Sequence, residues 1–156
     1  MKIKTQGALQ REINRLKRQG QKIVFTNGCF DLLHYGHAKY LQDAKNKGDI
    51  LVVAVNSDSS IRKIKGKNRP IVDERNRLKL LSALASVDYL TLFKEATPLE
   101  VIKKIKPDIL IKGADWEKSK IIGSGFVESY GGKVITIKLV KGLSTTSLVK
   151  KIVNSR

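Results

Sequence analysis

The stretch KIVFTNGCFDLLHYGH (residues 22–37) runs from a short apolar segment through a glycine turn to a pair of histidines. Residues 22–26 predict a short buried strand, which the turn pair Asn27-Gly28 ends. Residues 37–47 predict the helix that follows, with Gly48 as its stop. DILVVAV (49–55) is a continuous apolar run, typical of a strand covered on both faces. A strand, a helix and a second buried strand in this order indicate a parallel α/β unit.

The rest of the chain continues this alternation. The apolar patterns predict helices at 8–18 and 73–86, a helix capped by Thr97 that runs to about 104, and a last helix from the Ser144 cap to about 152. Strands are predicted at 88–93, 108–111 and 131–138. Residues 56–70 are polar, basic and aperiodic, and predict a long loop of the kind that is often functional. We therefore expect one α/β domain over residues 1–156: a Rossmann-like, doubly wound, parallel five-stranded sheet with an N-terminal helix.

Composition narrows the class of ligand. The 31 Lys and Arg residues against 14 Asp and Glu give a net charge of +17, which favours anionic ligands such as phosphates. The basic residues are spread along the chain and do not alternate with aromatics, so a solvated surface is favoured and no nucleic-acid partner is expected. The single cysteine, Cys29, excludes a disulfide framework within the chain. Without a long apolar run or a signal-peptide stretch, a cytoplasmic protein with no membrane partner is expected.

The loop after the first strand carries the strongest chemical signal. Ligands of such sheets bind at the carboxyl ends of the strands. Both histidines of the chain, His34 and His37, fall here, and their spacing at a helix start lets them face one point. Gly36 between them is expected to let a ligand approach the backbone, and a helix N-terminus suits phosphate. The alternatives are a chance surface pair, or a metal pair completed by Cys29 or Asp31.

A second motif supports the phosphate interpretation. Gly142-Leu143-Ser144-Thr145-Thr146 places three hydroxyls at the start of the last helix, where they can hold a polyphosphate; an ordinary helix cap needs only Ser144. Residues 28–37 resemble the GxFDxxHxGH signature of the cytidylyltransferase-like nucleotidyltransferases, within the HxGH superfamily, and residues 142–146 resemble the G-x-S-T-T segment of the same family. Together these motifs imply a nucleotidyltransferase.

Within that family, segments along nearly the whole chain most resemble the D-glycero-β-D-manno-heptose 1-phosphate adenylyltransferases; they include Val55-Asn56-Ser57-Asp58, Lys65-Gly66 with Arg69-Pro70-Ile71, and Pro107-Asp108 with Lys112-Gly113. The resemblance implies transfer of AMP from ATP to the sugar 1-phosphate, giving ADP-heptose and pyrophosphate. Asp115-Trp116-Glu117 and Lys39 resemble the glycerol-3-phosphate cytidylyltransferases instead, but Ala85 and Leu139 stand where that type has arginine. An FMN adenylyltransferase and a nonenzymatic basic nucleotide-binding protein are further alternatives.

The resemblance also implies roles for individual residues. The catalytic candidates are His34, His37 and Lys65, with Lys65 bridging the two substrates from the loop; a solvated lysine is the alternative. The nucleotide-binding candidates are these histidines with Asn27, Gly28, Cys29, Phe30, Gly113, Ala114, Ser144, Thr145 and Thr146. The candidates for the acceptor are Asp31, Asn56, Asp58, Lys65 and Arg77, although a surface role is the alternative for Arg77. Mg²⁺ is expected to arrive with ATP without a dedicated protein site, and a homodimer is expected.

Overall fold

The computed structural model describes residues 1–155. In chain order its elements are α1 (Gln6–Arg18), β1 (Ile23–Gly28), α2 (Tyr35–Lys45), β2 (Ile50–Asn56), α3 (Asp58–Lys65), α4 (Glu74–Ala83), β3 (Tyr89–Phe93), α5 (Leu99–Ile105), β4 (Ile109–Gly113), the 3₁₀ helix η1 (Lys118–Lys120), α6 (Ser124–Ser129), β5 (Lys133–Ile137) and α7 (Thr145–Val153).

The strands form one parallel five-stranded sheet in the order β3-β2-β1-β4-β5. The chain moves from β1 outward to β2 and β3, and then returns to β4 on the other side of β1. This reversal of direction confirms the doubly wound topology, and it places a topological switch point between β1 and β4.

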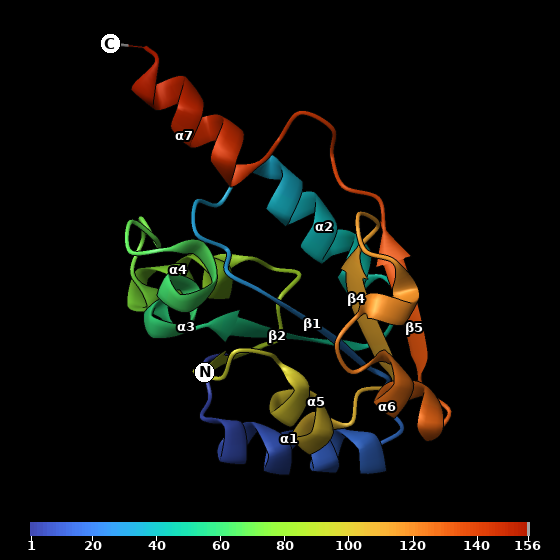
Figure 1. Cartoon of the computed structure of the whole chain (residues 1–156). Helices are drawn as coiled ribbons and strands as arrows, with labels where there is room; N and C mark the ends of the chain where they lie inside the picture. The colour runs from blue at the N-terminus through green and yellow to red at the C-terminus, as the bar shows by residue number, and fades with distance from the viewer. Residues whose placement is uncertain (156) are drawn as a thin grey trace.

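Helices cover both faces of the sheet (Figure 1). One core cluster joins α1, α5 and α6 to side chains such as Phe25 of β1 and Leu110 of β4. The other joins α2 and α4 to Val24 and Ile111, which are the neighbours of those residues along the same strands. Because successive side chains of a strand point to opposite faces, this division identifies the face to which each strand residue belongs. Leu51 to Asn56 of β2 are all buried, as the apolar run predicts for a strand covered on both faces.

The structure corrects the predicted long loop at 56–70. Residues Asp58–Lys65 form helix α3, for which Ser57 is the N-cap: its hydroxyl accepts a hydrogen bond from the Ser60 N–H. Gly66 ends the helix with φ of +92°, a conformation that favours glycine. The helix buries Ile61 while its last turn carries basic side chains, so the apolar periodicity was too weak to predict it.

Smaller differences concern the bounds of two helices, one short helix and the edge of the sheet at β3. Pro98, not Thr97, occupies the N-cap position of α5, and the predicted helix at 73–86 ends at Ala83. The six-residue helix α6 was not predicted. The N-terminal residues Lys2 and Lys4 exchange backbone hydrogen bonds with Leu90, which covers part of the exposed edge of β3.

The last helix agrees with its prediction and extends away from the sheet. Helix α7 begins after the Ser144 cap and projects from the domain, and none of its residues is buried (Figure 1). None of the helices in residues 1–155 combines the length and the apolar character that crossing a membrane requires.

Candidate active site

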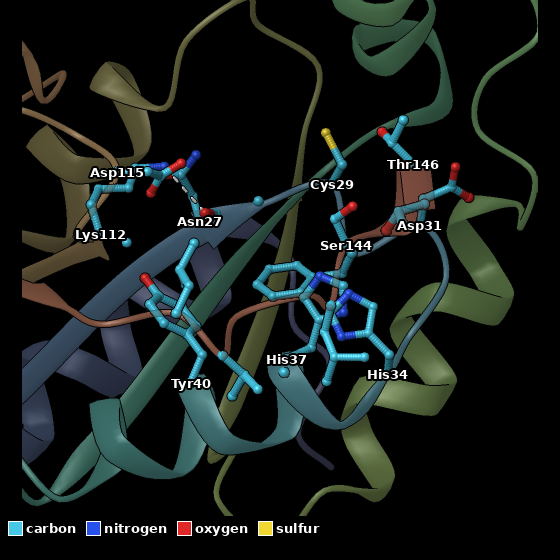
Figure 2. Close-up of a pocket in the computed structure, with 18 of the residues that line it drawn as sticks. Asn27, Cys29, Asp31, His34, His37, Tyr40, Lys112, Asp115, Ser144 and Thr146 are labelled. Atoms are coloured by element: carbon cyan, nitrogen blue, oxygen red, sulfur yellow. Dashed lines mark hydrogen bonds between the residues drawn. The ribbon is translucent and has the colours of Figure 1, made fainter. Parts of the chain in front are cut away.

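A cavity of about 420 Å³ opens at the carboxyl ends of β1 and β4, where the chain order of the sheet reverses (Figure 2). Its walls come from the β1–α2 segment, the ends of α3 and β4, and the segment that leads into α7. They comprise Asn27, Gly28, Cys29, Phe30, Asp31, His34, Gly36, His37, Tyr40, Lys65, Lys112, Gly113, Asp115, Trp116, Leu139, Val140, Leu143, Ser144, Thr145 and Thr146. The two sequence motifs therefore meet in one cavity.

The turn after β1 is built around the ring of Phe30. Phe30 has φ of +49°, which is uncommon for a residue other than glycine. The surrounding contacts must therefore hold the backbone in this conformation. A Cβ at Gly28 would lie 3.0 Å from that ring, so the tight contact favours glycine there. The Phe30 ring in turn packs edge-on against His37, with 5.5 Å between the ring centroids. The motif glycine and phenylalanine thus fix the position of the second histidine.

The two histidines lie against each other at the start of α2. Their rings stack with centroids 3.9 Å apart and an interplanar angle of 28°. A Cβ at Gly36 would lie 2.9 Å from the His34 ring and 3.5 Å from Leu143. Gly36 therefore makes room for the His34 ring and for the segment before α7. Gly36 also lines the cavity, and the expectation that its missing side chain lets a ligand approach the backbone stays a prediction.

Both imidazoles are neutral at pH 7. Burial, followed by the nearby His34 and Lys65, lowers the pKa of His37 to about 4, and burial also lowers the pKa of His34. The Nδ1 atoms of both rings are buried and have no hydrogen-bond partner within residues 1–155. A neutral imidazole keeps one N–H donor. The pair can therefore donate hydrogen bonds to an anion.

The N-termini of α2 and α7 converge on this point. Ser144 forms a capping box with Ser147, in which its hydroxyl accepts the Ser147 N–H at 3.0 Å. Its hydroxyl thus serves the cap, while Thr145 and Thr146 also line the cavity. Free backbone N–H groups at a helix N-terminus and the positive end of the helix dipole both favour phosphate. Two such termini in one cavity suit a polyphosphate.

Lys65 reaches the same cavity from the C-terminal end of α3. Its side chain is exposed, and its charge contributes to the lowered pKa of His37. Lys65 therefore extends from a helix end next to Gly66, and the prediction that it lies in an aperiodic loop is wrong. Lys65 still lines the cavity.

Asp31 links the turn after β1 to the segment that follows α3. The Asp31 carboxylate accepts hydrogen bonds from the Ile71 and Val72 N–H groups at 2.8 and 2.9 Å, and from Arg69 at 2.9 Å. Burial alone would raise the pKa of Asp31, but these hydrogen bonds outweigh it and lower that pKa. Although Asp31 lines the cavity, its oxygens are thus engaged in fixing the segment after α3.

The structure contradicts the expectation that Arg77 reaches a phosphate. Its side chain is fully buried and does not line the cavity. The guanidinium donates to the carbonyls of Val72, Cys29 and Asn56 at 3.0, 2.5 and 2.7 Å. It also pairs with the Asp58 carboxylate at 2.8 Å. Arg77 is a structural crosslink between the ends of β1 and β2 and the segment before α4.

Three further expected residues lie outside the cavity lining. Asn56 is buried and donates to the Ser60 hydroxyl at 3.0 Å, and Asp58 pairs with Arg77. Ala114 is exposed, and its N–H donates to the Ile137 carbonyl. Gly113, which was predicted together with Ala114, does line the cavity. Asn56, at the end of β2, and Asp58, at the start of α3, therefore stabilise the backbone next to the cavity and do not line the cavity itself.

Cys29 and the metal alternative can be judged from the same geometry. Burial raises the pKa of the Cys29 thiol, so the thiol is protonated at neutral pH and is a poor nucleophile or metal ligand. Across residues 1–155, no three His, Cys, Asp or Glu side chains are grouped so that they can hold a metal ion. Within this described part of the chain, no third ligand of these types is grouped with the stacked histidines, so the metal interpretation gains no support.

The family model of the cytidylyltransferase-like proteins matches residues 25–152, which include every wall of this cavity. The chain belongs to the cytidylyltransferase-like family. Members of this family are nucleotidyltransferases, and the convergence of two phosphate-binding helix ends on a neutral histidine pair agrees with that class of enzyme.

Similar proteins refine the position within the family. The chain is 49% identical over 154 residues to the bifunctional protein HldE of Geobacter metallireducens, and 52% identical over 139 residues to that of Paramagnetospirillum magneticum. It spans only 31% and 28% of the length of these two relatives. The crystal structure of the lipopolysaccharide core biosynthesis protein from Thermoplasma volcanium is 36% identical, with a TM-score of 0.65 over 78% of this chain and 98% of that one. A pantoate-β-alanine ligase of Francisella tularensis shares the fold at 17% identity and a TM-score of 0.62, covering 99% of this chain and 77% of that one.

Sequence reasoning did not assign several other residues that line the cavity of this cytidylyltransferase-like chain. Leu139, Val140 and Leu143 contribute an apolar wall, Trp116 also lines the cavity, and Asp115 lies beside Gly113. Lys112 also lines the cavity, although it was not among the predicted site residues. A lysine directly after the apolar run 109–111 is the signal that marked it, because that position falls at the carboxyl end of a parallel strand.

Proposed function

We propose that the chain transfers AMP from ATP to D-glycero-β-D-manno-heptose 1-phosphate, giving ADP-heptose and pyrophosphate. One observation carries the proposal. The polyphosphate end of the cavity, formed by the starts of α2 and α7, is continuous with an apolar wall at Leu139 that suits a nucleobase. The resemblance of nearly the whole chain to the heptose 1-phosphate adenylyltransferases supports the choice of acceptor. The name of the Thermoplasma relative, a lipopolysaccharide core biosynthesis protein, supports the same choice.

The proposed reaction is an in-line displacement at the α-phosphorus. An oxygen of the acceptor's phosphate forms the new P–O bond, and the bond from the α-phosphorus to the bridging oxygen of pyrophosphate breaks. A phosphomonoester with a second pKa of about 6 is already ionised at neutral pH, so no side chain needs to remove a proton. The work of the protein is to position two anions and to stabilise the charge that shifts to the leaving pyrophosphate.

The residues of the cavity supply that stabilisation. His34 and His37 donate hydrogen bonds to the phosphates without adding two fixed positive charges. The Thr145 and Thr146 hydroxyls and the helix ends bind the β- and γ-phosphates. Lys65 lines the same cavity, and we infer that its ammonium acts between the two substrates.

We expect ATP to enter as its Mg²⁺ complex. Asp31 and Asp115 are the carboxylates in the cavity lining, and the Asp31 oxygens are occupied by hydrogen bonds. The donor set fits a metal held mostly by phosphate oxygens and water, with Asp115 as the carboxylate within reach. A homodimer and a cytoplasmic location stay predictions.

Nucleotide choice separates this function from the main alternative. The arginine positions of the glycerol-3-phosphate cytidylyltransferases carry Ala85 and Leu139, and Leu139 forms the apolar wall itself. This wall favours packing against a purine over hydrogen bonding to cytosine. Asp115-Trp116-Glu117 and Lys39 are the features that favour the cytidylyl alternative.

A product assay tests the proposal. The chain is incubated with Mg²⁺ and either ATP or CTP, and with the heptose 1-phosphate, glycerol 3-phosphate or FMN. Pyrophosphate release and the mass of the nucleotide product are measured. ADP-heptose is expected to dominate. CDP-glycerol or FAD as the main product would replace the proposed reaction, and pyrophosphate from none of the pairs would favour a nonenzymatic nucleotide-binding protein.

A further inference from the structure

Lys112 is a second cation of the cavity that the proposed mechanism does not yet use. It is the penultimate residue of β4, and its side chain is mostly buried and lines the cavity. The Nζ atom donates to the Asn27 carbonyl at 3.2 Å and lies 5.8 Å from the centroid of the Trp116 ring. No salt bridge within residues 1–155 neutralises it. An ammonium has three N–H donors, so Lys112 can bind a further acceptor.

Burial of the Lys112 ammonium without an ion pair carries a free-energy cost. It lowers the pKa of Lys112 to about 8, although the nearby Cys29 and Asp115 act in the opposite direction. A partly desolvated cation without an ion pair is stabilised when an anion binds beside it. Lys112 therefore favours binding of a negatively charged group in this part of the cavity.

The alternation of side chains along the strands places Lys112 on a definite side of the sheet. Thr26 of β1 faces α2, because its hydroxyl lies 2.7 Å from the Tyr40 hydroxyl. Asn27, the next residue, therefore faces the side of α1 and α5, as Phe25 does. Along β4, Leu110 packs on the α1 side, and Lys112 follows it with the same direction.

The polar groups of the cavity thus divide into two sets across the edge of the sheet. Figure 2 shows Asn27 and Lys112 on one side of the β1 ribbon and His34 and His37 on the other. The histidines share their side with the starts of α2 and α7, where the leaving pyrophosphate is expected to bind. An in-line displacement requires the attacking oxygen to approach the α-phosphorus from the side opposite to the leaving group.

We propose that Lys112 binds the phosphate of the acceptor, and that Asn27 binds a hydroxyl of its sugar. This assignment rests on the proposed function, since it takes the direction of attack from that reaction. Asn27 Oδ1 is buried and has no hydrogen-bond partner within residues 1–155. An amide oxygen accepts hydrogen bonds, which suits a hydroxyl donor and not a phosphate. The pair therefore recognises a hydroxylated phosphomonoester, and Asn27 belongs to the acceptor and not to the nucleotide.

The experiment compares binding of the two substrates to the wild-type chain and to three variants. Lys112→Met removes the charge and keeps the length of the side chain, and Lys112→Arg keeps the charge. Lys133→Met is the matched control, because Lys133 is exposed at the opposite end of the sheet. Calorimetry gives the Kd of α,β-methylene-ATP and then the Kd of D-glycero-β-D-manno-heptose 1-phosphate in its presence. Thermal melts check that each variant is folded.

Lys112→Met is expected to weaken binding of the heptose 1-phosphate about 10- to 100-fold, the usual effect of losing a hydrogen bond to a charged group. Binding of the ATP analogue is expected to stay within about 3-fold, since Lys112 lies on the other side of the sheet edge. Lys112→Arg is expected to retain most of the acceptor affinity, and Lys133→Met all of it. In steady state, the KM for the acceptor is expected to rise more than the KM for ATP.

Two results overturn the assignment and differ in what they imply. Equal acceptor affinity in Lys112→Met and wild type, or a loss confined to the ATP analogue, removes Lys112 from the acceptor site while the proposed function stands. A wild-type chain that neither binds nor converts the heptose 1-phosphate overturns the proposed function, and this assignment with it.

Discussion

Replacing Arg77 by methionine tests whether the cation that the sequence suggested for phosphate binding is structural. The variant removes the hydrogen bonds to the carbonyls of Val72, Cys29 and Asn56 and leaves Asp58 without its ion pair. Breaking a buried ion pair costs about 3–5 kcal/mol of stability, and Asp58 recovers part of this because its side chain is 21% exposed. The unpaired buried carbonyls offset that recovery, so we expect a loss of about 3–4 kcal/mol.

The assay is urea unfolding at pH 7, with Arg75→Met as the control because Arg75 is exposed on the same helix. For a domain of this size, the expected loss corresponds to a fall of about 10 °C in Tm. Arg77→Lys keeps a charge but fewer hydrogen bonds, so its stability is expected to lie between those of the wild type and Arg77→Met. Loss of ATP-analogue binding by Arg77→Met with less than about 1 kcal/mol of destabilisation would refute the structural role and return Arg77 to the phosphate site.

Three further predictions concern the phosphate end of the cavity. His34→Ala and His37→Ala are each expected to lower kcat about 10²- to 10³-fold while shifting Tm by only a few degrees; near-normal rates with a large melting shift would make the pair structural. Lys65→Met is expected to lower kcat without changing Tm, because the residue is exposed at the end of α3; unchanged turnover would make it one more surface lysine. Because the pKa of His37 is about 4 in the folded chain and ordinary when unfolded, the unfolded chain binds more protons between these values. Stability is therefore expected to fall as pH drops from about 6.5 to 5, and less steeply in His37→Gln; equal slopes in urea titrations would contradict the lowered pKa.

The sequence predicted those features whose cause is local. The apolar run 50–55 has no polar face and is rich in β-branched residues, which favours a strand covered on both sides, and β2 is such a strand. Ser144 precedes an apolar periodic segment and caps α7 as expected. The GxFDxxHxGH spacing requires a turn and a helix start, and it was enough to place both histidines in the cavity.

Features that depend on packing between distant segments were not predictable in this way. Helix α3 gains its stability from the burial of Ile61 and from the contact of Ser60 with the Glu95 carbonyl, neither of which has a local signature. Asp31 was expected to contact substrate, yet the carboxylate accepts hydrogen bonds from residues some forty positions further along the chain. A charged residue near a motif therefore indicates the neighbourhood of a site without indicating which partner it finds there.

Arg77 and Lys112 show why position in the sequence alone does not assign the role of a cation. A planar guanidinium with donors in several directions can satisfy carbonyls from three converging segments at once, and Arg77 is used in this way at the ends of β1 and β2. A lysine carries a compact charge that shifts its pKa when buried, and Lys112 keeps donors available after a single contact with Asn27. In a chain with a net charge of +17, most cations are simply solvated. The informative cation is the one that is buried, unpaired and directed into the cavity, and strand alternation identifies it once the register of β1 and β4 is known.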